Sequence, residues 1–256
     1  MSEQNKQDAT QRFSARVDDY AKYRPSYPAE LLDYMQQTIG VQSGHKVADI
    51  GAGTGIFTAL LLERGLDVFA VEPNEPMRRA AGETLPAEHL HLVDGSAEQT
   101  NLPDHSVNVI ICAQSFHWFD TQRAVSEFRR IAGADGKLVL IWNTRLQTGS
   151  EFLERYEQLL QQFGTDYNEV NHQHMFSQLQ HPVFREGTMQ RATFINRQVL
   201  DLDGVQGRLR STSYVPSAGE PGYAQMMEEA ERIFNETEQD GVVYMDYETE
   251  VYWGQL

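Results

Sequence analysis

The chain has 256 residues, of which 40% are hydrophobic and 23% charged, as in ordinary globular domains and unlike disordered chains. Its formal net charge of −16 argues against nucleic acid and anionic membranes as partners, because such a surface repels phosphate groups. The single cysteine, Cys112, excludes an intramolecular disulfide and is expected to be a small buried hydrophobe.

The first 40 residues are predicted to form an N-terminal arm followed by a helix. The start of the chain is polar and lacks an apolar signal core, and no stretch reaches the roughly 20 apolar residues of a membrane span, so a cytoplasmic location is expected. Residues 13–28 are rich in aromatic side chains, and Pro25 and Pro28 oppose a helix there. A helix is predicted from Pro28 to about Gly40.

Residues 46–143 alternate between short apolar segments and amphipathic segments. The apolar segments predict strands at 46–50, 67–72, 90–94, 107–114 and 136–143. The amphipathic segments predict helices at 55–65, 74–85 and 121–133. Such alternation implies an α/β fold with a mainly parallel sheet covered by helices on both faces.

Residues 144–240 change character and are expected to form an insertion on the substrate side of the sheet. Helices are predicted at 150–164 and 222–237, and a strand at 189–200 that leads into a helix ending near 213. Residues 241–256 alternate apolar and polar side chains, which indicates a final antiparallel strand. We therefore expect residues 41–256 to form a single domain.

A glycine-rich loop, ADIGAGTG, joins the first strand to the helix after it. Gly51, Gly53 and Gly55 permit a tight turn and let the backbone approach a ligand, and the helix start presents free N–H groups. A dinucleotide fingerprint needs glycine or alanine where Ile56 stands, and the Gly-Lys-Ser/Thr of a P-loop does not occur here. Another Rossmann-type nucleotide-dependent enzyme is thus an alternative that the loop disfavours.

Acidic residues stand at the ends of the first two strands. Asp49 lies just before the glycine loop, and Glu72 ends the second strand in VFAVEP. A carboxylate in the second position can accept hydrogen bonds from both hydroxyls of a ribose. Glu72 is therefore predicted to bind the ribose of a cofactor, with a solvated loop carboxylate as the alternative.

Four separated segments carry a family resemblance. In order and spacing they resemble the motifs of class I S-adenosylmethionine-dependent methyltransferases over about residues 45–143: VADIGAGTGIFTALLLERG, VFAVEPNEPM, DGSAEQTNLPDHSVNVIICAQSFHWFD and FRRIAGADGKLVLIWN. The YRPSYP arm and the HWFD turn are similar to the trans-aconitate methyltransferase type, in the methyltransferase type 11 group. The resemblance implies a Rossmann-like seven-stranded sheet with an antiparallel last strand, and S-adenosylmethionine as cofactor.

The same resemblance assigns the first cofactor contacts. Gly51, Gly53 and Gly55 match the loop under the methionine part of the cofactor, next to Asp49, and Glu72 matches the ribose-binding acid.

The adenine contacts follow further along the chain. Pro73 and Met77 would lie near the adenine ring. The usual Gly-Asp-Ala-Glu is replaced here by Gly-Ser-Ala-Glu, so Ser96 would accept from the adenine amine without supplying a charge, and Ala97 would offer its backbone N–H.

The fourth strand ends in the polar and aromatic segment AQSFHWFD. Ligands of open parallel sheets sit at the carboxyl ends of the strands, so Gln114, His117 and Trp118 are predicted to line the site where the acceptor meets the methyl group. His117 is either a general base for a hydroxyl or amine, or a hydrogen-bond donor to a carboxylate that needs no base. Phe116 and Phe119 are expected to fill the core.

Two arginines and three arm tyrosines complete the predicted substrate site. Arg145 and Arg24 are candidate counter-charges for an acidic substrate, with surface salt bridges as the alternative. Tyr20, Tyr23 and Tyr27 either shield the site as a lid or pack a helix onto the sheet. Tyr27 is taken as a substrate contact.

The sequence thus predicts an S-adenosylmethionine-dependent methyltransferase acting on a small molecule, at oxygen, with a carboxylate as the finer expectation. A non-catalytic protein that binds the same cofactor is the second alternative. Methyl transfer from a sulfonium requires no metal, and the HLH at 89–91 and the HQH at 172–174 lack a convincing third ligand. A monomer or homodimer is expected.

Overall fold

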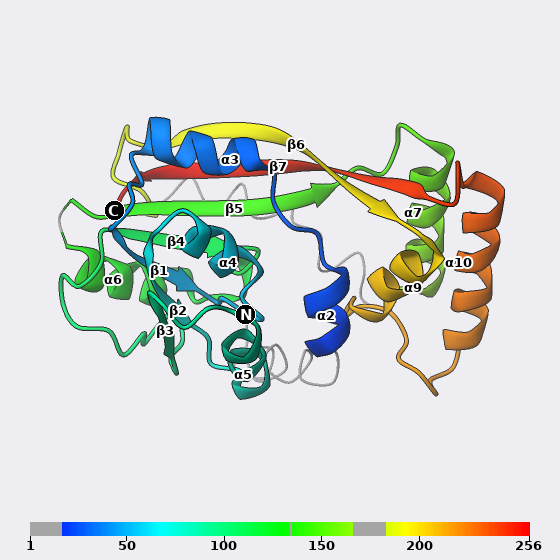
Figure 1. Cartoon of the computed structure of the whole chain (residues 1–256), viewed down its shortest axis with the longest axis horizontal. Coiled ribbons are helices and arrows are strands. Elements are labelled where there is room, and N and C mark those ends of the chain that lie inside the picture. The colour runs from blue at the N-terminus through cyan, green and yellow to red at the C-terminus, as the bar shows by residue number, and fades with distance from the viewer. Residues whose placement is uncertain (1–16, 134, 166–182) are drawn as a thin grey trace.

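The computed structural model describes residues 17–133, 135–165 and 183–256, which contain one seven-stranded sheet (Figure 1). The strands lie in the order β3-β2-β1-β4-β5-β7-β6. Strands β1 to β5 are parallel, and β7 is antiparallel to both of its neighbours, β5 and β6. Their bounds are Lys46–Ile50 (β1), Asp67–Val71 (β2), Leu90–Val93 (β3), Val109–Ala113 (β4), Lys137–Arg145 (β5), Gln190–Leu200 (β6) and Val243–Gln255 (β7).

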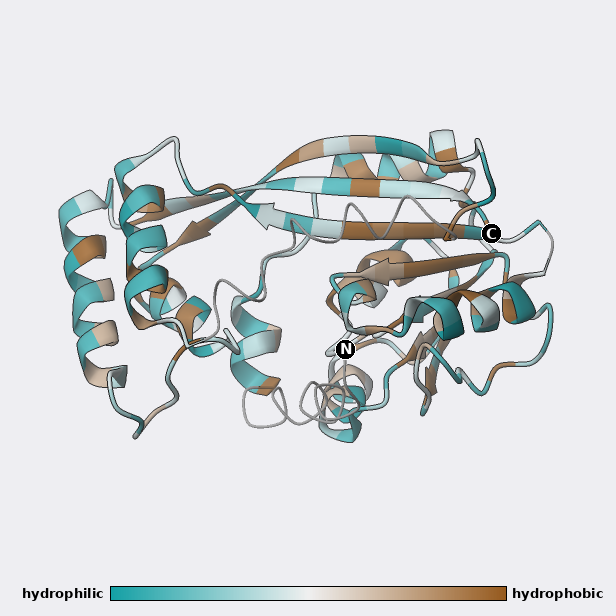
Figure 2. Ribbon diagram, turned by 180° about the vertical axis from the view of Figure 1, so that it is seen from behind, coloured by the Kyte–Doolittle hydropathy of each residue, from teal (hydrophilic) through white to brown (hydrophobic). Residues whose placement is uncertain are grey.

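Helices pack on both faces of the parallel strands. Successive residues of a strand point to opposite faces of the sheet and therefore join different cores. Ile110 and Cys112 join the core that contains Phe128 of α6 (Thr121–Ala132). Ile111 joins the opposite core, with Leu31 of α3 (Ala29–Tyr34) and Leu61 of α4 (Ile56–Glu63). The central strands are accordingly brown in Figure 2, whereas the edge strand β6 is mixed. The predicted α/β class is confirmed.

The elements predicted from the sequence occur close to their expected positions, including α5 (Glu75–Thr84). The arm differs, because Val17–Tyr23 forms a helix, α2, where the prolines were expected to oppose one. That expectation was wrong for this stretch, since Pro25 disfavours helix at its own position and at Arg24 before it, and the helix ends at Tyr23. The predicted helix after Pro28 continues from α3 into a π-helical turn, Met35–Ile39, which ends at Gly40 with a positive φ of 80°.

The long strands β5, β6 and β7 extend beyond the parallel part of the sheet toward a group of three helices (Figure 1). These are α7 (Glu151–Phe163), α9 (Leu202–Arg210) and α10 (Tyr223–Thr237), which enclose their own core with the start of β7. Helix α2 packs against α9 and also contacts α5. No helix in the described ranges is long and apolar enough to cross a membrane.

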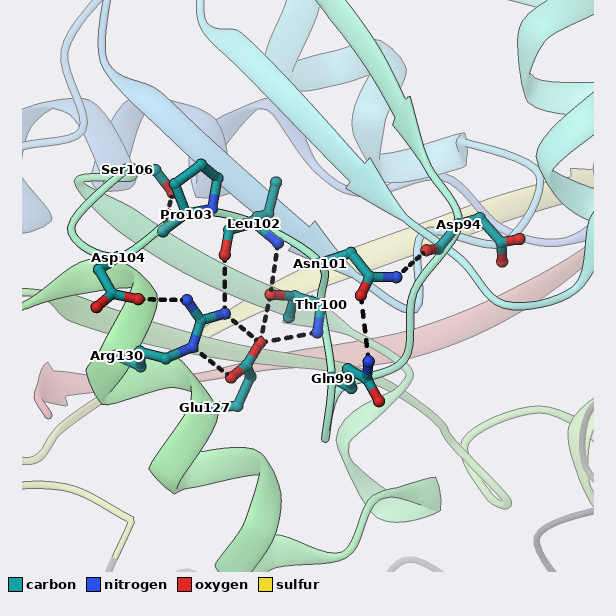
Figure 3. Close-up of polar contacts among 10 residues, drawn as sticks. All are labelled: Asp94, Gln99, Thr100, Asn101, Leu102, Pro103, Asp104, Ser106, Glu127 and Arg130. Carbon is teal, nitrogen blue, oxygen red and sulfur yellow. Dashed lines mark hydrogen bonds and ion pairs between the residues drawn. The ribbon is translucent and has the colours of Figure 1, made fainter.

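The connection from β3 to β4 is fixed onto α6 by a polar network (Figure 3). Glu127 accepts from the backbone N–H and the hydroxyl of Thr100, at 2.8 and 2.6 Å. Arg130 donates to Glu127 and to Asp104, and its guanidinium holds the pKa of Glu127 at about 2. These contacts fix a segment that has little regular structure of its own.

Candidate active site

A cavity of about 310 Å³ lies at the carboxyl ends of β1, β2, β4 and β5. One side is formed by the loops that follow β1 and β2 and by the start of α5. The other side is formed by the arm, the end of β5, and residues of α9, β7 and the loop after α9. A volume of this size is in the range of small-molecule sites.

The glycine loop forms the floor of the first side. Gly51 and Gly53 have positive φ angles of 70° and 58°, which favour glycine, and both line the cavity. A Cβ on Gly51 would lie 2.6 Å from the Cβ of Ser115, so only glycine lets the loop approach the end of β4. Gly55, with φ of 84°, stands at the start of α4 and is not among the residues lining the cavity. A Cβ on Gly55 would lie 2.5 Å from the side chain of Leu85, so glycine is needed there for packing.

Glu72 is buried at the end of β2 and is oriented by the backbone around it. Its two carboxylate oxygens accept from the N–H groups of Gly53 and Asn74, at 2.9 and 2.8 Å. Burial raises the pKa of Glu72, and these two hydrogen bonds and the nearby charge of Arg78 oppose the rise. Each oxygen keeps lone-pair capacity for a ligand, because a carboxylate accepts about four hydrogen bonds in all.

Asp49, only 1% exposed, lines the same side of the cavity. The hydroxyl of Thr58 donates to its carboxylate at 2.6 Å. Burial raises the pKa of Asp49 to about 7, against the hydrogen bond from Thr58 and with a further contribution from the charge of Glu72. A cation bound in the cavity would favour the ionised form.

Thr54 is a lining residue that the sequence analysis did not single out. It is buried, and its hydroxyl has no hydrogen-bond partner within the described part of the chain. Buried polar groups are normally satisfied, so an orphaned hydroxyl on a cavity wall points to a ligand. Pro73 and Met77 line the cavity beside it, as does Asn74, whose side chain caps α5.

Ser96 and Ala97 are not among the lining residues. Ser96 exchanges backbone hydrogen bonds with Gln99, at 3.0 and 3.2 Å. Ala97 is buried in the core beneath α6. The structure does not bring these two residues to the cavity wall, and their role at adenine stays a prediction.

The end of β4 brings Gln114, His117 and Trp118 to the cavity. Gln114 has a positive φ of 58° and donates from Nε2 to the backbone oxygen of Asn143, at 3.1 Å. The rings of His117 and Trp118 contact each other, with centroids 4.8 Å apart. Phe116 is buried in the core as expected, whereas Phe119 packs on the core and also lines the cavity.

The two predicted counter-charges have different surroundings. Arg145 lines the cavity but is paired with Glu157 and stacks on the ring of Tyr156, so its charge is balanced within the protein. Arg24 also lines the cavity, and its Nη2 donates to the backbone oxygen of Ser211 at 2.8 Å. Of the two, only Arg24 has no carboxylate partner in the parts of the chain that are described.

The second side of the cavity also contains a predicted residue, Tyr27, and three that no sequence motif indicates. Tyr27, which was predicted, packs edge-on against Phe57, and burial keeps its pKa well above the usual value. Arg208, Tyr214 and Tyr247 were missed, because they lie in segments with no motif and reach the cavity only through the packing of α9 and β7.

No group of three metal-binding side chains occurs among the residues described. His91 lies 2.8 Å from the carboxylate of Asp67, and His89 is close to the same carboxylate at the sheet edge. The HQH at 172–174 lies outside the described residues.

Solved structures with the same fold include methyltransferases. A candidate type II methyltransferase from Anaeromyxobacter dehalogenans superimposes with a TM-score of 0.68 over 91% of this chain and 98% of that one, at 23% identity. A geranyl diphosphate C-methyltransferase from Streptomyces coelicolor A3(2) gives a TM-score of 0.50 at 13% identity, with 98% of each chain covered. The fold is therefore the Rossmann-like methyltransferase fold, as predicted.

Sequence comparison also finds methyltransferases. Residues 48–140 match the family model described as a methyltransferase domain. An uncharacterised methyltransferase of Mycobacterium tuberculosis is 40% identical over 141 residues, which cover 55% of this chain and 56% of that protein. The chain thus spans little more than half the length of this relative. Residues 48–140 therefore match a methyltransferase domain, as the resemblance carried by the four motifs predicts.

Proposed function

We propose that this protein transfers a methyl group from S-adenosylmethionine to an oxygen of a small-molecule acceptor, and that this oxygen belongs to a carboxylate. The observation that carries the proposal is one cavity whose lining residues come partly from the segment that matches a methyltransferase domain, residues 48–140, and partly from the rest of the chain. It is lined on one side by Glu72 and the glycine loop, and at the end of β4 by His117 and Trp118.

The residues of the first side fit the cofactor. Glu72 has capacity to accept from ribose hydroxyls, and the orphaned hydroxyl of Thr54 offers a further polar contact. Gly51 and Gly53 let the backbone approach the ligand, and ionised Asp49 would favour a positively charged group. When bound, S-adenosylmethionine supplies a methyl group on a positively charged sulfur.

The residues at the end of β4 suit an acceptor that needs orientation more than deprotonation. A carboxylate is already ionised at neutral pH, so His117 and the indole N–H of Trp118 would hold it by hydrogen bonds. The backbone turn at Gln114 and the contact between the two rings position these groups. Buried Tyr27 keeps its phenolic proton at neutral pH and can donate as well.

The proposal also assigns a role to each segment of the chain. The N-terminal region, residues 1–40, acts as a lid through the arm and helix of its described part, residues 17–40. Residues 41–256 act as one methyltransferase domain with 144–240 as a substrate-side insertion. Support comes from Tyr20 and Tyr27, which line the cavity from the arm. The protein is proposed to act in the cytoplasm as a monomer or homodimer, without a metal and without nucleic-acid or membrane partners.

The test is an assay with labelled S-adenosylmethionine and a panel of small carboxylic acids, alcohols and amines. We expect label in a carboxylic acid product that mild base hydrolyses, because methyl esters are base-labile. A labelled product stable to base would contradict the carboxylate. Replacing His117 and Trp118 by alanine should abolish turnover with cofactor binding retained; tight binding of NAD(P) with none of S-adenosylmethionine would overturn the proposal as a whole.

A further inference from the structure

Two arginines from distant parts of the chain meet on the second side of the cavity. Arg24 follows α2 in the arm, and Arg208 lies in the last turn of α9; both line the cavity. Helices α2 and α9 pack against each other, as Figure 1 shows near the middle of the molecule. The two guanidinium groups share one anchor, since Arg24 donates to the backbone oxygen of Ser211 and Arg208 donates to its hydroxyl.

Arg208 is a buried charge that lacks an acidic partner in the described ranges. It is only 7% exposed, and its hydrogen bonds run to Tyr247 at 3.3 Å and to Ser211 at 3.1 Å, both uncharged. A buried charge without a counter-ion is costly, so proteins usually pair it. This chain has 37 acidic and 21 basic side chains, so the missing partner does not reflect a shortage of carboxylates.

Arg24 is half-buried and also lacks an acidic partner among the described residues. Its guanidinium lies over the ring of Tyr20, and its Nε is buried with no hydrogen-bond partner among the described residues. Burial lowers the pKa of Arg24, and the positive charge of Arg208 lowers it further, which is the electrostatic sign of two guanidinium groups close to one another. Arginine still stays charged at neutral pH.

Arg145 on the same wall provides the internal comparison. Its charge is balanced by Glu157, which is itself buried. The protein therefore neutralises one arginine of the cavity and, so far as the structure describes the chain, leaves two adjacent ones for a ligand. A guanidinium binds the oxygens of carboxylate and phosphate groups with paired hydrogen bonds, and two of them favour an anion strongly.

We propose that Arg24 and Arg208 form an anion-binding subsite that holds an oxyanionic group of the methyl acceptor, a carboxylate or phosphate, apart from the group that is methylated. The subsite rests on the proposed function in one respect, namely that the other side of the cavity holds the cofactor. The acceptor would then be a small acid with at least one anionic group that anchors it. The carboxylate of the cofactor has the same chemistry, so the test separates the two sources.

The test measures binding of citrate and of inorganic phosphate, by calorimetry, to the protein saturated with S-adenosylhomocysteine. We expect at least one anion to bind the wild-type protein, and Arg208→Gln or Arg24→Gln to weaken that binding about tenfold to a hundredfold. Arg208→Lys, which keeps the charge but loses the paired geometry, should fall between. Arg232→Gln, a matched change at an exposed arginine paired with Glu229, should leave binding unchanged.

A second titration identifies the source of the anion. S-adenosylhomocysteine carries a carboxylate and methylthioadenosine does not. We expect Arg208→Gln to change the affinity for either by less than about twofold, because no bond to this arginine is lost. If it weakens only S-adenosylhomocysteine, the cofactor carboxylate occupies the subsite and the proposal is wrong.

Other outcomes are equally decisive. Failure of both anions to bind at millimolar concentration, or binding that both glutamine variants retain, would contradict the subsite. Thermal unfolding of each variant checks folding, and Arg24→Gln, at a half-buried position, is the variant that should keep the fold if Arg208→Gln does not. If S-adenosylhomocysteine itself does not bind while citrate binds to the free protein, the proposed function fails; the anion site stands, but its assignment to a methyl acceptor does not.

Discussion

The two sides of the cavity are built in different ways. The side that we assign to the cofactor comes from residues 49–77, a single stretch of chain whose polar contacts are short and mostly to the backbone. The opposite side is assembled from residues 20–27, 143–147, 208–214 and 247. It depends on contacts between distant segments, such as the hydrogen bond from Tyr23 to Asp203 at 2.6 Å.

The difference teaches where each function resides. A loop fixed by its own glycines and by the ends of neighbouring strands suits a cofactor that does not vary. An arm held by Tyr23 and by Ser26, whose backbone oxygen accepts from Asn143 and Asn196, can change without disturbing the sheet. We therefore expect changes on the first side to abolish cofactor binding, and changes on the second side to alter the acceptor.

The largest effect is expected on the first side, from Glu72→Ala. The change removes the carboxylate that receives the N–H groups of Gly53 and Asn74 and that we assign to the ribose. The dissociation constant of S-adenosylhomocysteine should rise about a hundredfold, as for loss of charge-assisted hydrogen bonds. Calorimetry measures it, with Glu75→Gln, an exposed change in the first turn of α5, as the control. Unchanged affinity in Glu72→Ala would remove Glu72 from the cofactor site.

The next effect tests how the arm is held. A Cβ on Gly207 in α9 would lie 2.3 Å from the ring of Tyr23, so Gly207→Ala must displace that ring. We expect the free energy of unfolding in urea to fall by about 1–3 kcal/mol, as for an overpacked contact. In a Tyr23→Ala background the same change should be neutral or stabilising, because alanine is the better helix former. Equal destabilisation in both backgrounds would show that the contact does not hold the arm.

A smaller effect separates the two roles of His117. Asparagine can donate a hydrogen bond but cannot take up a proton at neutral pH. If His117 only holds a carboxylate, His117→Asn should lower turnover by no more than about tenfold, whereas loss of a general base costs about a hundredfold to ten-thousandfold. Initial rates at saturating cofactor decide between these, and Trp118→Phe is the companion change that removes the indole donor.

The smallest effect concerns pH. Burial raises the pKa of Asp49 to about 7, so the group is mostly neutral below pH 7 and ionised above it. A ligand that carries an ammonium group favours the ionised form, so binding releases a proton and affinity should rise with pH, by up to about tenfold per unit below the pKa. The rise should level off above pH 7 and be absent in Asp49→Asn. A pH dependence that persists in Asp49→Asn would assign it to another group.

The same comparison explains what could be predicted from the sequence. The α/β order, the antiparallel last strand and the positions of Gly51, Glu72 and His117 follow from periodicity and from loops that each belong to one strand end. Helix α2 is not predicted from the sequence, because the effect of Pro25 is there extended to residues 17–23. A proline disfavours helix only at its own position and at the residue directly before it.

Contacts between distant segments could not be predicted from short sequence patterns. Arg208 and Tyr247 reach the cavity through the packing of α9 and β7, which no short motif encodes. The pairing of Arg145 with Glu157 is also hidden from the sequence, because Glu157 lies on a helix twelve positions along the chain and spacing alone does not reveal the contact.

A crystal structure of the protein with S-adenosylhomocysteine tests the division of the cavity most directly. The account predicts ribose hydroxyls within hydrogen-bond distance of Glu72, the sulfur facing Gln114 and His117, and the arginine subsite of Arg24 and Arg208 left to another molecule. Density for the cofactor carboxylate on Arg208, or for the ribose away from Glu72, would contradict it.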